Sequence, residues 1–135
     1  MAPWWRTDDP LINPRIKVGT FTVPMIVRNL TTGASITVDA FVDTGASLPV
    51  LPGSLLRQIG VEPVSQQAFE LADGSRVEYP VGEVRITVEG RTVPTLCVFG
   101  PEGSTPLLGV VVLELAGLTV DPRERRLVPT PGLLL

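Results

Sequence analysis

The sequence contains no histidine and only one cysteine, Cys97, among its 135 residues. Without histidine the chain cannot form Ser-His-Asp or Cys-His catalytic sites, and a zinc site is disfavoured. A single cysteine cannot form a disulfide within the chain, and since Cys97 stands in an apolar run we expect a buried thiol. We therefore expect neither a metal nor a cofactor.

Basic clusters and long apolar runs are also scarce. The net charge is −3, and the arginines gather only at 123–126, where Glu124 interrupts them. A solvated turn is the simpler interpretation of this segment, so no nucleic acid is expected as a partner. The longest apolar run, 107–118, is broken by Gly109 and Glu114 and is too short to span a bilayer. The N-terminus lacks the pattern of a signal peptide, and we expect a cytoplasmic protein without a membrane span.

The residues that are present favour an all-β fold. Hydrophobic residues make up 44% of the chain, which is enough for the core of a single domain. The 14 prolines and 13 glycines, with few helix-forming stretches, favour short strands joined by turns. No internal repeat is visible. We divide the chain into an N-terminal arm at 1–16, a domain at 17–128 and a C-terminal tail at 129–135.

The clearest strand pattern leads into an aspartate. Residues 17–30 are rich in Val, Ile and Thr, and 31–33 (Thr-Thr-Gly) form a turn signal. Over 34–42, apolar and polar residues alternate. We predict a β-hairpin whose second strand ends directly before Asp43.

The following segments alternate between turn signals and apolar runs. We predict a short helical turn at 51–60, a second hairpin at 69–79 around Asp73-Gly74, and separate strands at 82–88 and 92–99.

The segment 110–116 is open to two interpretations. Its three consecutive valines favour a strand, whereas Leu-Glu-Leu-Ala followed by Gly117 favours a short helix with a glycine stop. Short strands are predicted afterwards at 118–121 and 125–128.

The informative motif is Asp43-Thr44-Gly45-Ala46-Ser47, which follows Phe41-Val42, with Leu107-Leu108-Gly109 about sixty residues later. This arrangement resembles the retropepsin-like aspartic proteases, the family of retroviral proteases and their cellular and bacterial relatives. The resemblance covers 17–128. It implies a single-domain subunit with a small, closed, β-barrel-like fold, a flap hairpin at 69–79, and one short C-terminal helix after Gly109.

The resemblance also implies a reaction. Two facing carboxylates that share one proton can activate water and polarise a peptide carbonyl at the same time. Asp43 would supply one of them, Thr44 would hydrogen-bond across a dimer axis, and Gly45 would permit the sharp turn of the loop. Because the chain carries this motif once, the second carboxylate must come from a second copy, which predicts a homodimer.

The expected substrate is a protein or peptide. The resemblance implies that Ala46 and the tip of the flap, formed by Ala72, Asp73, Gly74 and Ser75, contact it. Residues 48–51 are expected mainly in the core, with one or two lining a substrate pocket.

Two other functions stay open at this point. One is a catalytically quiet dimerisation or peptide-binding module on the same fold. The other is processing confined to the chain's own arm or tail.

Overall fold

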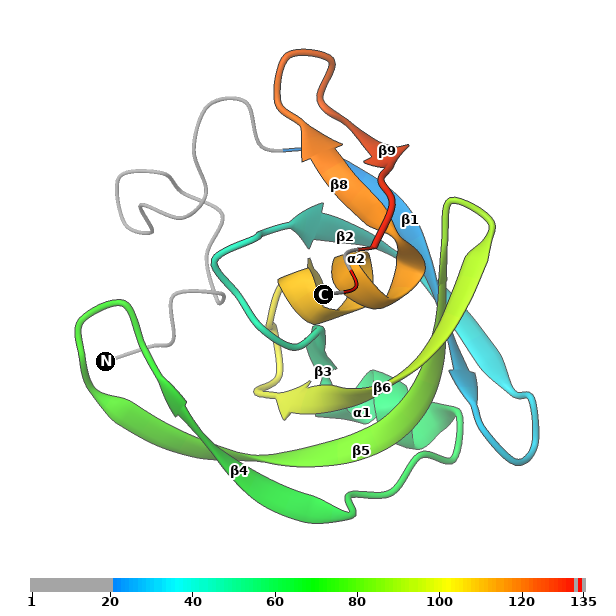
Figure 1. Cartoon of the computed structure of the whole chain (residues 1–135). Helices are drawn as coiled ribbons and strands as arrows, with labels where there is room; N and C mark the ends of the chain where they lie inside the picture. Colours follow the sequence, from blue (N-terminus) through cyan, green and yellow to red (C-terminus); the bar gives the residue numbers. More distant parts are fainter. Residues whose placement is uncertain (1–20, 133, 135) are drawn as a thin grey trace.

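The computed structural model of the protein describes residues 21–132 and 134. The predicted arm at 1–16 lies outside the described residues, and so does part of the tail. Most of the described chain is in strands (Figure 1). The strands are β1 (Thr22–Asn29), β2 (Ser35–Val42), β3 (Val50–Pro52), β4 (Ser65–Glu70), β5 (Arg76–Val88), β6 (Arg91–Gly100), β7 (Leu107–Leu108), β8 (Leu118–Asp121) and β9 (Arg126–Pro129). The helices are α1 (Gly53–Gln58) and α2 (Val110–Ala116).

Seven of these strands form one sheet that closes on itself. The strand order is β1-β2-β7-β3-β6-β5-β4, and β1 also pairs with β5, so that six strands form the barrel and β4 is attached outside the closure. The prediction of a small, closed, all-β fold is therefore confirmed. The short helix expected after Gly109 is α2, and α1 falls within the helical turn expected at 51–60.

The first hairpin forms as the sequence predicts. β1 and β2 pair antiparallel with Val27 opposite Ile36, and the side chain of Asn29 organises the turn. Its Oδ1 accepts hydrogen bonds from the backbone N–H groups of Thr31, at 2.8 Å, and Thr32, at 3.1 Å. The alternation along β2 buries its last apolar residues and delivers the chain to Asp43.

The strand β5 differs from the prediction. The sequence suggested a hairpin ending at Tyr79 and a separate strand from Gly82, but β5 runs without a break for 13 residues. Its first half pairs with β4 and its second half with β6. Gly82 is a point of close approach rather than a turn, because a Cβ there would lie 2.8 Å from the Phe99 ring and 3.0 Å from the Glu62 carbonyl oxygen.

Two apolar clusters stabilise the fold. The larger fills the barrel and includes the fully buried Met25, Leu56 and Ile86. The second cluster lies between the barrel and the β4–β5 hairpin and is built on Val50, Leu71, Val81, Val98 and Leu107. Burying one such side chain contributes about 1.5–3 kcal/mol, so the hairpin is held to the barrel by its apolar face.

Cys97 is fully buried in the larger cluster, as the sequence predicted. Burial raises the pKa of its thiol to about 12. The thiol is therefore neutral and inaccessible in the folded protein.

The ambiguous segment at 110–116 is a helix. Gly117 ends α2 in the left-handed conformation, with φ of 67°, and Arg91 Nη1 donates a hydrogen bond of 2.7 Å to the Ala116 carbonyl oxygen. These contacts satisfy backbone groups that a helix end otherwise leaves without partners. Within residues 21–132, no helix is long and apolar enough to cross a membrane.

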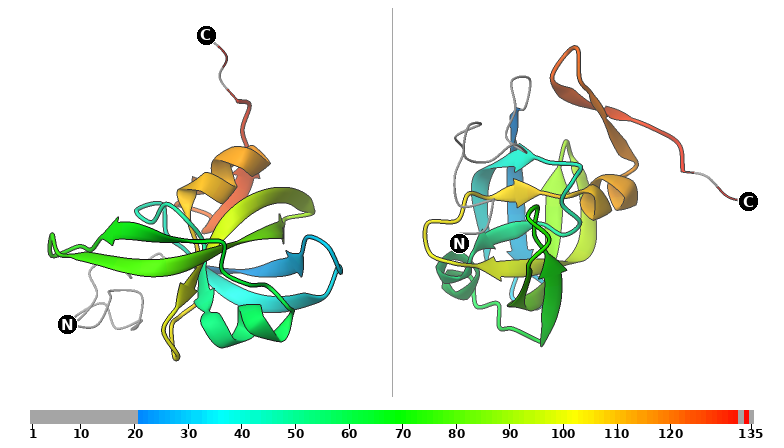
Figure 2. Two further views of the ribbon diagram at one scale, coloured as in Figure 1. Left: turned by 90° about the horizontal axis from the view of Figure 1, so that it is seen from below. Right: turned by 90° about the vertical axis from the view of Figure 1, so that its left-hand side faces the viewer.

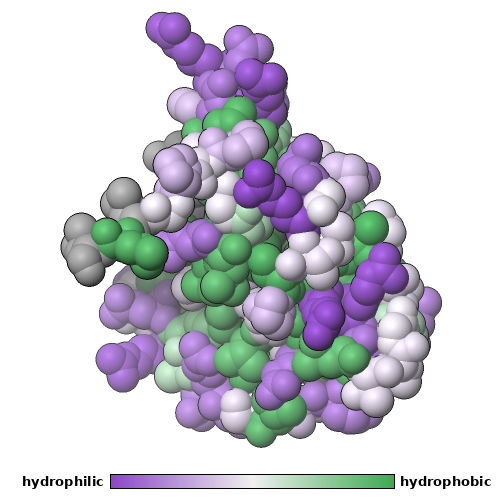
Figure 3. Space-filling model, turned by 45° about the vertical axis from the view of Figure 1, so that its right-hand side comes forward, coloured by the Kyte–Doolittle hydropathy of each residue, from purple (hydrophilic) through white to green (hydrophobic). Residues whose placement is uncertain are grey.

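After α2 the chain forms a separate two-stranded sheet, β8–β9. Figure 2 shows this hairpin standing apart from the barrel, and in Figure 3 its projecting end is mainly hydrophilic. The carboxylate of Asp121 accepts hydrogen bonds from the backbone N–H groups of Arg123 and Glu124, so the arginine-bearing segment is an exposed turn as expected.

Candidate active site

Asp43 is positioned by two strands that are far apart in sequence. β2 and β7 pair in parallel, with Phe41 opposite Leu107. Directly beyond this pair, the backbone N–H of Asp43 donates a 3.1 Å hydrogen bond to the carbonyl oxygen of Leu108. The residue lies at the end of β2 and is only 8% exposed, which is unusual for an aspartate.

The loop that begins at Asp43 holds its carboxylate in place. Asp43 Oδ1 accepts a 2.9 Å hydrogen bond from the backbone N–H of Gly45, and Oδ2 is buried as well. The N–H of Ala46 donates to the Asp43 carbonyl oxygen at 3.1 Å, which closes the turn. Thr44 and Gly45, in contrast, are exposed. A fixed carboxylate therefore lies directly beside two exposed residues of the described part of the chain.

The Leu107-Leu108-Gly109 segment supports this loop from behind. Both leucines are fully buried, and the residues that follow them donate hydrogen bonds into the loop. Val110 N–H donates to the Ala46 carbonyl oxygen at 2.8 Å, and Val111 N–H donates to that of Ser47 at 3.1 Å. This segment therefore packs behind the loop, and the packing depends on the absence of a side chain at Gly109.

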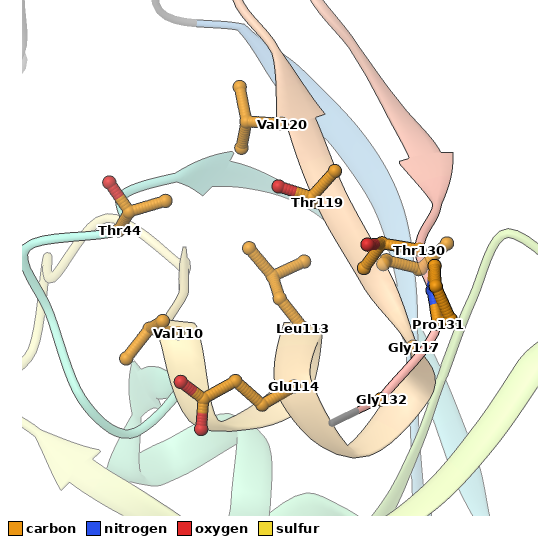
Figure 4. A pocket seen from close by; sticks show the side chains of 11 residues that line it. Thr44, Val110, Leu113, Glu114, Gly117, Thr119, Val120, Thr130, Pro131 and Gly132 are labelled. Atoms are coloured by element: carbon orange, nitrogen blue, oxygen red, sulfur yellow. The ribbon is translucent and has the colours of Figure 1, made fainter. Parts of the chain in front are cut away.

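A large hollow opens on one side of the loop, and we call it the Thr44 hollow. It has a volume of about 570 Å³ (Figure 4). Its walls come from the loop, from α2, from β8 and from the chain just after β9. The lining residues are Thr44, Val110, Leu113, Glu114, Gly117, Leu118, Thr119, Val120, Thr130, Pro131 and Gly132.

A second hollow of about 270 Å³ lies on the other side of the loop, and we call it the Leu48 hollow. It separates the loop from β4. The lining residues are Gly45, Ala46, Ser47, Leu48, Val50, Gln67, Ala68, Phe69, Glu70 and Val98. Ala46, predicted to contact substrate, lies in this wall, and so do two of the residues at 48–51.

The β4 side of the Leu48 hollow was missed by the sequence analysis. The predicted second hairpin began at Phe69, whereas β4 starts at Ser65, so Gln67 and Ala68 fell outside it. The exposed, polar Ser-Gln-Gln stretch gave no strand alternation from which this wall could be found.

The tip residues Ala72, Asp73, Gly74 and Ser75 form the exposed turn between β4 and β5. Asp73 Oδ1 accepts a 2.6 Å hydrogen bond from the Ser75 hydroxyl and a 2.9 Å bond from the Ser75 N–H. These bonds lower the pKa of the Asp73 carboxyl group, the hydroxyl bond most strongly. The tip lines neither of the two hollows, so its contact with substrate stays a prediction.

The described part of the chain contains no group of three or more His, Cys, Asp or Glu side chains that could hold a metal ion. The site offers one buried carboxylate, a backbone N–H that donates to it, and a hollow on each side of its loop. Such a carboxylate can act as a proton donor or acceptor, according to its protonation state.

The closed β-barrel and the Asp-Thr-Gly loop, supported by an apolar strand, define a retropepsin-like aspartic protease fold. A family model described as "gag-polyprotein putative aspartyl protease" matches residues 30–114, well over half of the chain. The chain therefore belongs to this family of retroviral-type aspartyl proteases.

Solved structures of viral proteases are similar to the chain. The solution structure of simian foamy virus (mac) protease has a TM-score of 0.48 and 17% sequence identity, over 68% of this chain and 90% of that one. EIAV protease complexed with the inhibitor HBY-793 has a TM-score of 0.48 and 19% identity, over 70% of this chain and 85% of that one. No curated protein sequence matches the chain.

Proposed function

We propose that the protein is an aspartic endopeptidase that hydrolyses peptide bonds as a homodimer, with water activated between two Asp43 carboxylates. The proposal rests on the burial and hydrogen bonding of Asp43 and on the exposure of the two residues that follow it. Asp43 is buried and fixed by the Gly45 N–H, while Thr44 and Gly45 beside it are exposed. A loop built in this way suits a second, identical loop facing it.

The chemistry requires the second copy. One carboxyl group cannot remove a proton from water and donate a proton to the substrate carbonyl in the same step, but a pair that shares one proton can do both. Each chain carries a single Asp-Thr-Gly motif. A two-fold axis beside Thr44 would place the two motifs face to face, as the family resemblance implies.

In the proposed reaction, the ionised Asp43 takes a proton from water while the water oxygen bonds to the peptide carbonyl carbon. The protonated Asp43 of the other chain donates its proton to the carbonyl oxygen. The tetrahedral species then returns a proton from its hydroxyl to a carboxylate, the nitrogen accepts a proton from the other carboxyl group, and the C–N bond breaks. The Gly45 N–H keeps Oδ1 oriented through these steps.

The β4–β5 hairpin suits the role of a flap. It extends from the barrel, and its apolar residues Phe69, Leu71 and Val77 belong to the second cluster beside the Leu48 hollow. A substrate held between this hairpin and the catalytic loop would be shielded from water, which strengthens the electrostatic interactions at the reacting atoms.

The test compares Asp43→Asn with Asp39→Asn, an exposed aspartate on the preceding strand. Peptide hydrolysis should fall to background in the first variant and stay at the wild-type level in the second, while both melt as the wild type does. Specific activity should also rise with enzyme concentration near the dimer dissociation constant.

A folded Asp43→Asn protein that cleaves like the wild type, or a monomer that cleaves, would overturn the proposal. A wild-type dimer that binds peptides but cleaves none from acid to neutral pH would identify a quiet binding module instead.

A further inference from the structure

Two arginines lie side by side on the outer face of the barrel, where β1 runs beside the second half of β5 (Figure 1). Arg28 on β1 is directly opposite Arg85 on β5, and both side chains are exposed. Their neighbours Val27 and Ile86 are fully buried, and successive side chains of a strand point to opposite faces, so both arginines point outward. Like charges directly opposite each other in a sheet are destabilising. The barrel therefore holds these two charges together against their mutual repulsion.

No acidic side chain neutralises this arginine pair. Within the described part of the chain, neither Arg28 nor Arg85 forms an ion pair. Glu83 lies two positions before Arg85, on the same outward face of β5, and is also exposed. Its carboxylate forms no ion pair with either arginine. Two positive groups and one negative group are therefore available to a partner on this face.

A hollow of about 430 Å³ borders the arginine pair, and we call it the Leu30 hollow. Leu30 follows Arg28 by two residues and is 41% exposed. Pro94, another lining residue, is opposite Arg85 in the β5–β6 pairing. The lining residues are Leu30, Glu83, Val84, Pro94, Thr95 and Leu96. None of them lines the Thr44 hollow or the Leu48 hollow, so this surface is separate from the candidate active site.

The spacing of the charges limits what can bind. Arg85 and Glu83 are two residues apart on a strand, which corresponds to about 7 Å, and an extended peptide repeats its side chains with the same spacing. A carboxylate at one position of such a peptide would meet Arg28 and Arg85. A Lys or Arg two residues away would meet Glu83, and its hydrocarbon stem would cover Leu30 and Leu96 in the hollow.

From this arrangement we infer that Arg28, Arg85 and the Leu30 hollow form a docking surface for an extended segment of a partner protein, in which an Asp or Glu lies two residues from a Lys or Arg. A nucleic acid fits less well, because Glu83 and the net charge of −3 repel its phosphates. The inference goes beyond the proposed hydrolysis, since it uses no residue of the loop that begins at Asp43.

The experiment is an NMR titration of the isotope-labelled full chain, carrying Asp43→Asn so that the probe is not cleaved. The probe is a peptide in which Glu-Thr-Lys is flanked by Gly and Ser. The spacing control has the same composition with the order Thr-Glu-Lys, which places the two charges on opposite faces of an extended chain. The probe should bind about tenfold more tightly than the control, with shifts centred on 28–30, 83–85 and 94–96.

The arginine pair is tested by combining Arg28→Gln with Arg85→Gln. Both side chains are exposed and lack ion pairs, and their repulsion is removed, so the double variant should melt no lower than the parent protein. Its affinity for the probe should fall about tenfold. The matched control combines Arg123→Gln with Arg125→Gln, which changes the net charge equally on the exposed β8–β9 turn and should leave the affinity unchanged.

The role of Glu83 is tested by Glu83→Gln. The parent protein should prefer the probe to a peptide in which Gln replaces its Lys, and this preference should disappear in the variant. The matched control is Glu89→Gln, at the exposed turn after β5, which should keep the preference.

Four results would overturn the inference. One is equal binding of the probe and the spacing control, a comparison that requires no variant of the surface. Another is unchanged affinity in the folded Arg28→Gln, Arg85→Gln protein. Tighter binding of an oligothymidylate at the same amides would identify a nucleic-acid site instead. Stronger binding of the probe after Asp8→Asn with Asp9→Asn would identify the chain's own N-terminal arm as the occupant.

The docking surface and the proposed hydrolysis fail independently. If the Asp43→Asn protein binds the probe as described while the wild type hydrolyses no peptide, the proposed hydrolysis fails and the docking surface stands. If the wild type hydrolyses peptides while the probe and its spacing control bind equally, hydrolysis stands and the docking surface fails.

Discussion

Gly109 lies directly against the backbone of Ser47. A Cβ on Gly109 would lie 2.7 Å from the carbonyl carbon of Ser47 and 2.9 Å from the carbonyl oxygen of Ala46. Both obstructing groups are backbone atoms of the loop that begins at Asp43, so neither can move aside by a change of rotamer. The loop and the chain behind it can pack only if this position has no side chain.

The first prediction is that Gly109→Ala displaces the loop that begins at Asp43. Forcing a methyl group into this contact should lower the free energy of unfolding by about 3 kcal/mol, the upper part of the usual range for overpacking. Hydrolysis should be lost even where the variant is folded. Urea denaturation and a peptide-cleavage assay measure the two effects.

The matched control is Gly132→Ala, since a Cβ on Gly132 would have no atom within 4 Å. It should unfold at the same urea concentration as the wild type. A Gly109→Ala protein with wild-type stability and activity would show that the loop does not depend on this contact.

The second prediction concerns Thr44 and assembly. Thr44→Val keeps the size of the side chain but removes its hydroxyl group, and two such hydroxyls would be lost in a dimer. If each takes part in a hydrogen bond across the axis, the dimer dissociation constant should rise about tenfold or more, since one such bond contributes about 1 kcal/mol. Sedimentation velocity over a dilution series measures the change.

Thr37→Val is the control, because Thr37 is an exposed threonine on the first half of β2. It should leave the dissociation constant unchanged. If the Thr44→Val protein dimerised as tightly as the wild type, the Thr44 hydroxyl would make no hydrogen bond that stabilises the dimer.

The third prediction concerns the ionisation of Asp73. The Ser75 hydroxyl is the main cause of its lowered pKa. Ser75→Ala should therefore move that pKa up toward the ordinary aspartate value, because the ionised carboxylate loses a donor. Carboxyl NMR titration measures this change directly.

The lowered pKa of Asp73 also determines how the stability of the folded protein depends on pH. A lowered pKa in the folded state stabilises the turn above the unfolded pKa of 3.8, and this contribution is lost as the pH falls through the folded value. Ser65→Ala, at an exposed serine on β4, should not alter the titration of Asp73. An unchanged Asp73 pKa in Ser75→Ala would contradict the assignment of the hydroxyl as the cause.

The fourth prediction concerns Cys97 at alkaline pH. Its pKa rises from 9.0 to about 12 because of burial, which outweighs the hydrogen bond from the Leu51 backbone. Between these values the unfolded chain has lost the thiol proton while the folded chain keeps it. Stability should therefore be intact below pH 9 and fall with a one-proton slope as the pH rises toward 12.

The measurement compares the unfolding free energy of wild type and Cys97→Ala from pH 7 to 11. The difference between the two should shrink above pH 9, since only the wild type loses this contribution. A thiol reagent should also leave Cys97 unmodified until the protein unfolds. Rapid labelling of the native protein would contradict the burial.

Local patterns in the sequence were sufficient for several elements and for the placement of Asp43 at the end of a strand. The alternation that ends at Val42, the turn signals at Gly33 and Gly74, and the position of Asp43 after a strand were all predicted correctly. These features depend on neighbouring residues, because backbone preference and side-chain period act over a few positions.

The tertiary structure alone decided which distant segments meet. It joined β7 to β2 in parallel behind Asp43, made β5 continuous through Gly82, and placed Gln67 across a hollow from Leu48. It also made 110–116 a helix, where the local pattern was undecided. The physical reason is that pairing and close approach depend on what lies opposite in space, and the period of a single strand does not specify its partner.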